Sequence, residues 1–232
     1  MVAFSPQPKQ WPWIRRFNPH FHGYAYYGPA GELQTSWHHW HYFEIDPKGG
    51  GRFGQFLERF QDRPTAPFVV FNAGGKKVVS PPGLYTWYQL SNEWLTNASS
   101  VVSGSMRYRF GGFYDGDFKA IELTGAFRVG SRFNASTGWT RQIINLPYGK
   151  FNTDLVPTKL IYSFTPLYTL QAYIQYNNQI SQFSSNIRLA LMGRSGTGVF
   201  VVYNDTRDTT SYDPHTILGR SFIVKYSRLI DF

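Results

Sequence analysis

Large apolar side chains return at every second position in many short segments of this chain. This period indicates β-strands with one apolar and one polar face. In residues 167–177, every other residue from Tyr168 to Tyr176 is apolar or aromatic, while the positions between them are mostly polar. No segment sustains the 3.6-residue period of a helix, and no apolar run approaches the roughly 18 residues that a membrane helix needs. We therefore expect an all-β protein with little helix.

Turn-forming residues divide the chain into about twelve candidate strands of the length that a tilted membrane strand requires. We interpret them as an antiparallel transmembrane β-barrel over residues 15–232, preceded by a lead-in over residues 1–14, and these strands could form part of a larger barrel. The candidate strands are residues 15–27, 33–45, 52–62, 83–95, 100–112, 117–129, 133–145, 155–164, 167–177, 184–193, 198–204 and 220–232.

The composition favours the same class of protein. Aromatic residues make up 19% of the 232 residues, yet the mean hydropathy is only −0.35. Membrane barrels combine these features, because their strands face lipid with alternate residues and carry aromatic girdles at both interfaces. The absence of cysteine excludes a disulfide-stabilised secreted module and a thiolate metal site.

The final segment, residues 222–232, alternates in the same way, and Arg228 alone interrupts its apolar face. The apolar positions are Phe222, Val224, Tyr226, Ile230 and Phe232. A strand of this kind resembles the signal that the barrel-assembly machinery reads in bacterial outer-membrane proteins. We therefore expect this machinery, the lipid bilayer and lipopolysaccharide as partners, and the bacterial outer membrane as the location.

The connections between the candidate strands differ in length. Barrels of this class place long loops on the outer side of the membrane and short turns on the periplasmic side. The longer connections, which we expect outside, are residues 63–82, 146–154, 178–183 and 205–219. The shorter ones, which we expect inside, are residues 96–99, 165–166 and 195–198.

Several short motifs between residues 81 and 204 are similar, in order and spacing, to the C-terminal barrel of the DUF5916 family. The motifs are Pro-Pro-Gly-Leu-Tyr at 81–85, Gly-Phe-Tyr-Asp-Gly at 112–116, Leu-Pro-Tyr-Gly-Lys-Phe at 146–151, Tyr-Ser-Phe-Thr-Pro at 162–166, Gln-Tyr-Asn at 175–177, Ser-Asn-Ile-Arg-Leu at 185–189 and Phe-Val-Val-Tyr-Asn at 200–204. The run at 192–198 departs from the tryptophan and Pro-Gly-Ser-Asp-like turn that the family usually carries there. The resemblance implies an outer-membrane barrel and transfers no catalytic residue.

Members of this family are longer and usually carry an N-terminal carbohydrate-binding domain of the family 9 type. The first ten residues of the present chain lack the charged and apolar segments of a signal peptide. We therefore expect the chain to be the C-terminal part of a longer polypeptide, with the export signal and a soluble periplasmic domain upstream.

Histidines gather in two short runs, at 20–22 and 38–41. Residues two apart on a strand share a face, so adjacent strands could bring two such pairs around one zinc ion, with Glu44 completing or orienting the site. The candidate ligands are His20, His22, His39 and His41. The alternative, which we favour, is that these rings are interfacial residues beside Trp37 and Trp40. We therefore expect no metal and no cofactor.

The chain carries a net charge of +9, and its arginines are spread along the strands without forming one patch. This distribution disfavours a nucleic-acid partner. In a barrel, some of these charges would fall on the polar face. The predicted pore-lining residues are Arg107, Arg109, Glu122, Arg128 and Arg188. An open lumen with this lining would favour anions.

Taken together, these patterns indicate a non-enzymatic outer-membrane barrel segment. It would act as a pore, or as the membrane anchor of the upstream domain, with a carbohydrate or small anionic solute as a candidate ligand. An alternative is a soluble β-sandwich that binds carbohydrate through exposed tryptophan and tyrosine, because a sandwich shows the same alternation. A metal-dependent enzyme built on the histidines is a third hypothesis.

Overall fold

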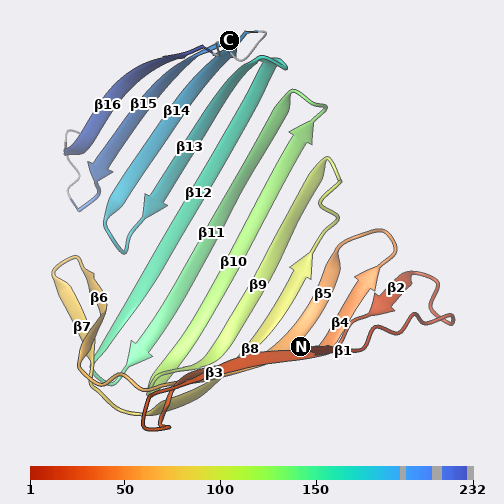
Figure 1. Ribbon diagram of the computed structural model, residues 1–232, viewed down its shortest axis with the longest axis vertical. Helices are drawn as coiled ribbons and strands as arrows, with labels where there is room; N and C mark the ends of the chain where they lie inside the picture. Colours follow the sequence, from red (N-terminus) through yellow and green to blue (C-terminus); the bar gives the residue numbers. More distant parts are fainter. Residues whose placement is uncertain (194–196, 211–215, 229–232) are drawn as a thin grey trace. The chain divides into compact units, whose positions relative to one another are not determined.

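The computed structural model describes residues 1–193, 197–210 and 216–228, which form sixteen strands and no helix (Figure 1). The prediction of an all-β, antiparallel protein is therefore confirmed, although with sixteen strands and not twelve. No helix in these residues is long and apolar enough to cross a membrane. The strands are β1 (Val2–Ala3), β2 (Ile14–Phe17), β3 (His20–Tyr27), β4 (Leu33–Pro47), β5 (Arg52–Asp62), β6 (Phe68–Ala73), β7 (Lys76–Ser80), β8 (Tyr85–Leu95), β9 (Val102–Phe113), β10 (Gly116–Val129), β11 (Phe133–Leu146), β12 (Gly149–Thr165), β13 (Tyr168–Asn177), β14 (Gln182–Met192), β15 (Gly198–Asp208) and β16 (Ile217–Ser227).

Fourteen of these strands belong to one sheet, in the order β1-β3-β4-β5-β8-β9-β10-β11-β12-β13-β14-β15-β16, with β2 paired to β4. Strands β6 and β7 form a separate two-stranded sheet. The chain divides into two compact units. Unit 1 is Met1–Ser99, Ser103–Leu123 and Thr140–Thr153, and unit 2 is Ser100–Val102, Thr124–Trp139 and Asp154–Phe232.

The first predicted strand, residues 15–27, is in fact two strands. Proline has no N–H to donate, so Pro19 interrupts the ladder, and the register of pairing with β4 shifts by one residue across this point. Strand β2 pairs with the end of β4, where Phe17 lies opposite Ile45. Strand β3 pairs with the rest of β4, beginning with His20 opposite His41.

One of the predicted long connections is wrong. Residues 149–154 belong to β12, so Pro147 and Tyr148 alone join β11 to β12. The connection over residues 63–82 is long, as expected, but it contains the hairpin of β6 and β7, which was not predicted. The other two long connections are shorter than expected, because β14 begins at Gln182 and β15 extends to Asp208. The predicted difference in loop length between the two ends of the strands is correspondingly weaker.

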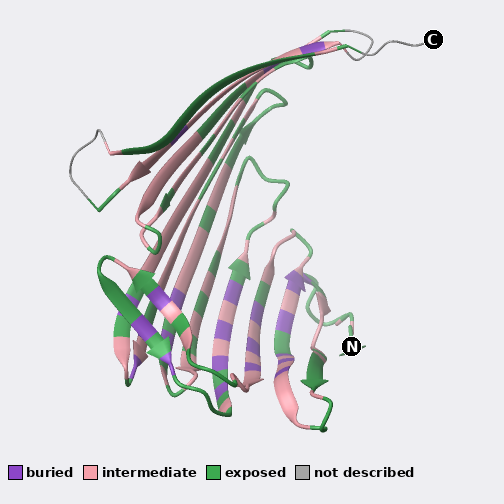
Figure 2. Ribbon diagram, turned by 60° about the vertical axis from the view of Figure 1, so that its left-hand side comes forward, coloured by how far each residue is buried: buried purple, intermediate pink, exposed green. Residues whose placement is uncertain are grey.

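The hairpin of β6 and β7 supplies the apolar core of unit 1. Phe71 of β6 stacks on Phe151, with ring centroids 4.5 Å apart, and Val78 of β7 is 1% exposed. The buried cluster that joins the hairpin to strands β10, β11 and β12 is Phe71, Val78, Phe118, Ala120, Ile144, Leu146 and Phe151. These buried residues of the hairpin appear as purple bands in Figure 2. The hairpin therefore covers part of one face of the sheet.

Two tyrosines contact the hairpin at its edges. The hydroxyl of Tyr148 donates to Ser80 Oγ, at the end of β7, at 2.9 Å. The ring of Tyr114 lies 5.3 Å from that of Phe68 in β6, and its hydroxyl donates to Asp62 Oδ2, at the end of β5, at 2.7 Å. A Cβ atom at Gly149 would lie 2.7 Å from a methyl carbon of Val78, so glycine at this position lets the hairpin approach closely. The two tyrosines lie in the short turns beside the hairpin.

In unit 2, antiparallel pairing aligns like side chains across five neighbouring strands. One row contains only large apolar residues, while the row one residue further along β13 contains the polar residues Gln171 and Arg188. The apolar row is Tyr162, Leu170, Leu189, Val201 and Val224. The neighbouring row is Ile161, Gln171, Arg188, Val202 and Ile223. We call the side of unit 2 that carries the apolar row its apolar face, and the opposite side its polar face.

Replacing Val78 by alanine should destabilise unit 1 by roughly 2 kcal/mol, because two buried methyl groups are lost and a small cavity remains. The same change at Val79, which is 37% exposed on the next position of β7, should have little effect. Urea unfolding and amide hydrogen exchange in the hairpin measure both. Equal effects of the two variants would show that the hairpin is not packed as described.

Burial raises the pKa of Tyr148 to about 12, and Asp115 adds to this effect. The neutral phenol therefore contributes stability that is complete below about pH 10 and is lost as the pH rises toward 12. Tyr148→Phe should flatten the loss of stability over this interval, while Tyr26→Phe, at an exposed position, should leave it unchanged. Hairpin hydrogen exchange corrected for intrinsic rates, or urea unfolding at each pH, gives the slopes. Parallel slopes for the wild type and Tyr148→Phe would contradict the assignment.

Candidate functional site

The polar site of unit 1 lies on one face of the sheet. The beginning of β3 and the middle parts of β4, β5, β8 and β9 contribute residues to it. We call this side of unit 1 the histidine face. It contains a hollow of about 350 Å³. The residues that line the hollow are His20, His22, Trp37, His39, His41, Arg52, Phe56, Glu58, Glu93, Arg107 and Arg109.

The four histidines predicted to share faces form a two-by-two ladder. His20 lies directly opposite His41 and His22 opposite His39 in the pairing of β3 with β4. The ring centroids are 4.2 Å apart in the first pair and 4.6 Å in the second. Residues two apart on a strand project to the same side, so all four rings lie on the histidine face. The structure thus brings together the residues that the sequence placed in two separate runs.

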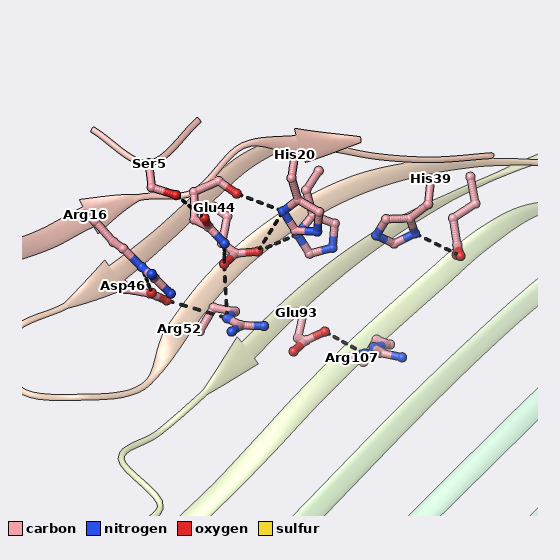
Figure 3. Close-up of polar contacts among 12 residues, drawn as sticks. Ser5, Arg16, His20, His39, Glu44, Asp46, Arg52, Glu93 and Arg107 are labelled. Carbon is pink, nitrogen blue, oxygen red and sulfur yellow. Dashed lines mark hydrogen bonds and ion pairs between the residues drawn. The ribbon is translucent and has the colours of Figure 1, made fainter. Parts of the chain in front are cut away.

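Three of these rings are oriented by oxygen acceptors (Figure 3). The Nδ1 atom of His20 lies 2.9 Å from the carbonyl oxygen of Asn18. The Nδ1 atom of His39 lies 3.2 Å from Glu58 Oε1, and that of His41 lies 2.5 Å from Glu44 Oε2. An Nδ1–H that donates to an oxygen leaves the Nε2 atom of the same ring as an acceptor. The environment therefore favours one tautomer at each of these three histidines.

A β-bulge explains how Glu44 reaches His41. The pairing of β4 with β5 shifts between His41 and Phe43, so one extra residue is inserted in β4. In a regular strand, residues three apart lie on opposite faces. The extra residue places Glu44 on the same face as His41. Glu44 therefore projects beside His41, and it is 1% exposed.

The buried acids Glu44 and Asp46 are surrounded by cations. Asp46 Oδ2 accepts from Arg16 Nε at 2.7 Å and from Arg15 Nη2 at 3.1 Å, and Arg52 Nε lies 3.4 Å from Glu44 and 3.6 Å from Asp46. The contacts of Arg16 and Arg52 appear on the left of Figure 3. They satisfy charges that would otherwise be expensive to bury, and they tie β2 to the end of β4.

Three of the predicted pore-lining residues lie on the histidine face and are paired with one another or with a further acid. Arg107 donates to Glu93 Oε2 at 2.6 Å, and Arg109 donates to Glu122 Oε1 at 2.5 Å. Neither arginine therefore presents an uncompensated charge. Arg107 also lies over the ring of Phe56, at 5.6 Å from the ring centre.

The other two predicted pore-lining residues belong to unit 2. Arg188 is on the polar face and lies over the ring of Phe200, 4.7 Å from its centre. Arg128 is exposed near the end of β10. The pore-lining role of all five residues stays a prediction.

The predicted assembly signal can be followed over part of its length. Phe222, Val224 and Tyr226 lie on the apolar face of β16, opposite Tyr203, Val201 and Val199 of β15. Their side chains are exposed. Ile230 and Phe232 lie outside the described residues.

Sequence reasoning missed several members of the site. Glu58 and Glu93 are buried acids that contact a histidine and an arginine, and Arg52 lies close to both acids at the end of β4. The sequence of β5 did contain a usable signal. Arg52, Phe56 and Glu58 are an even number of residues apart, so their side chains project from the same face of the strand. The pairing of β5 with β8, which places Gly54 opposite Glu93, cannot be read from local patterns.

Comparison of the chain with protein-family models, with curated proteins and with solved structures finds no match in any of the three. The resemblance to the DUF5916 family therefore stays a prediction.

Asp46→Asn should weaken unit 1 by about 1–3 kcal/mol, because a buried carboxylate is lost while half-exposed arginines keep their charge. The effect should be largest in β2, whose amides should exchange faster. Asp117→Asn, at an exposed position of β10, is the matched control and should be neutral. A stable β2 in Asp46→Asn would show that these ion pairs do not hold it.

Proposed function

We propose that this chain forms part of an outer-membrane β-barrel, with the apolar face of unit 2 against lipid. The observation that carries the proposal is the set of large apolar side chains that stay exposed across β12 to β16. Phe222, Val224 and Tyr226 are 68%, 61% and 62% exposed. A soluble monomer rarely leaves so broad an apolar surface uncovered. Hydrocarbon is the environment in which such a surface is stable.

The extent of the apolar face suits a bilayer. From Tyr168 to Tyr176, β13 advances eight residues, which is roughly 26 Å along the strand at about 3.3 Å per residue. Tilted by about 40°, this segment rises roughly 20 Å along the membrane normal. The whole of β13 has 10 residues, which is within the roughly 9–11 residues that a tilted membrane strand needs. At one end of the band, the buried carboxylate of Asp205 accepts from Arg207 and Arg220. Charges at this position suit the headgroup region.

The polar face of unit 2 supports the same proposal. Asn186, Asn204 and Ser221 are joined in a hydrogen-bonded row across β14, β15 and β16, with distances of 2.5 and 2.9 Å. A barrel strand points its apolar residues outward and its polar residues inward, as these strands do in the proposal. A β-sandwich would instead cover the apolar face with a second sheet, and in the described part of unit 2 no second sheet does so.

Closure into a barrel is part of the proposal, because open strand edges are not tolerated in lipid. The strand order is linear among the described residues, with β1 and β16 at its ends. Closure would require these ends to meet or to pair with strands of a longer polypeptide. We further propose a non-enzymatic role, as a pore or as the anchor of an upstream periplasmic domain, with lipopolysaccharide and the barrel-assembly machinery as partners. The salt bridges of Arg107 and Arg109 reduce the positive charge available to attract anions.

Two adjacent valines of β15 separate the membrane proposal from a soluble fold. Val201 lies on the apolar face and Val202 on the polar face, and both are partly exposed. Val201→Arg should destabilise the protein in lipid vesicles by roughly 2–4 kcal/mol, the cost of arginine near the bilayer midplane. Val202→Arg should cost much less, because it meets water or polar groups. Urea unfolding in vesicles and heat-dependent gel mobility measure the difference.

A wild-type chain that folds as a monomer in buffer without detergent would overturn the proposal. So would equal tolerance of arginine at both positions in vesicles. Both variants replace a valine of the same strand by arginine, so the effects of strand propensity and side-chain size cancel in the comparison.

A further inference from the structure

The histidine ladder has the geometry of a metal site. One nitrogen each from His20, His22 and His39 lies within 4.8 Å of the other two. Zinc binds imidazole nitrogen at about 2.0–2.1 Å, so an ion between the three rings requires only small side-chain rotations. His20 and His22 come from β3 and His39 from β4, so the ligands are held on two paired strands and not on a loop.

The surroundings of the rings match those of metal-binding histidines. Such histidines usually donate the N–H of the other ring nitrogen to a carboxylate or a backbone carbonyl, which fixes the tautomer and makes the ligand more basic. His20 has the carbonyl of Asn18 in this role, and His39 has the carboxylate of Glu58. The Nε2 atoms of both rings are then available to an ion.

An independent observation concerns the third ring. The Nδ1 atom of His22 is buried and has no hydrogen-bond partner among the described residues. Buried polar atoms are nearly always paired. The Nδ1 atom of His38 is also buried and unpaired, but the His38 ring lies against Phe21 and Trp40 on the opposite face. The unpaired atom of His22 instead lies beside two oriented histidines, and this combination points to a ligand. A metal ion would satisfy this atom.

The structure offers a second set of candidate ligands, His20, His41 and Glu44. Glu44 is already engaged, because its carboxylate accepts from His41 at 2.5 Å and from Asn18 at 2.9 Å and lies 3.4 Å from Arg52. Binding an ion there would break contacts that are made without one. The first set loses no such contact.

We propose that His20, His22 and His39 bind a divalent transition-metal ion, with Zn²⁺ as the expected metal and Glu58 as a positioning residue. Imidazole ligands suit zinc, copper and nickel, and three histidines leave one coordination position open. The three histidines line the same hollow as Arg52, Arg107 and Arg109, and water or an anion in this hollow would complete the coordination. This inference concerns unit 1 alone, and it does not depend on the membrane proposal for unit 2.

The test is titration of the purified, metal-free full chain with Zn²⁺ in competition with a chromogenic chelator, in whichever detergent or buffer keeps it folded. We expect one equivalent to bind. His22→Ala and His39→Ala should lower the affinity by at least tenfold, and Glu58→Gln by about 10–100-fold, as for other partners of metal-binding histidines. His38→Ala is the matched control, because His38 lies on β4 next to His39 but on the opposite face. It should stay within about twofold of the wild type, a difference well below that of a lost ligand.

Co²⁺ substitution provides a readout of the coordination itself, because the visible spectrum of bound Co²⁺ reports ligand number and geometry. His22→Gln keeps a polar side chain of similar size, and it should abolish the spectrum even if His22→Ala fails to fold. Circular dichroism and gel mobility verify the fold of each variant.

Absence of stoichiometric Zn²⁺ binding to the folded wild type would overturn the proposal. Unchanged affinity in His22→Gln and His39→Ala would also overturn it. If His41→Ala removes binding while the His22 variants retain it, the ion belongs to the His20, His41 and Glu44 set, and the assignment made here is wrong.

Discussion

Antiparallel strand pairing is the constraint on which the rest of this structure depends. Because each strand alternates its side chains between two faces, pairing in register collects every second residue of several strands into one continuous surface. In unit 2 this produces the apolar row that contains Leu189 and Val201 and the polar row that contains Asn186 and Asn204. The same rule in unit 1 places two histidine pairs from separate runs of sequence in ring contact. A slip of one residue in either place would exchange the faces and remove both features.

A β-bulge and an added hairpin shape the site of unit 1. The bulge between His41 and Phe43 changes the parity of β4, so that the carboxylate of Glu44 meets an imidazole three residues away. The hairpin of β6 and β7 then supplies apolar residues to a face that also carries charged groups. Phe118 connects the two environments, because it belongs to the hairpin core and also lies beneath the guanidinium of Arg109, 5.2 Å from the ring centre. Packing on one side and ion pairs on the other therefore constrain the same strands.

The sequence predicted the regular part of the fold well, because period two is a local property. Strands such as β5 and β13 were predicted within one residue of their observed bounds. Errors occurred where local signals conflict with pairing. A long connection was predicted over residues 146–154, but in the structure Pro147 and Tyr148 form a tight turn, and Gly149 allows Val78 to approach. The hairpin of β6 and β7 was missed because its strands are short and flanked by glycine and proline, which also occur in unstructured connections.

The sequence by itself determined the class of structure and the separation of apolar from polar positions, since both follow from residue order along one strand. It also identified the histidines, because each pair is two residues apart. Only the tertiary structure decided which charges meet. The contacts of Glu58 with His39, of Glu93 with Arg107 and of Asp46 with Arg16 join residues that are 14 to 30 positions apart. Such contacts depend on register and on one inserted residue, and a pattern read along a single strand contains neither.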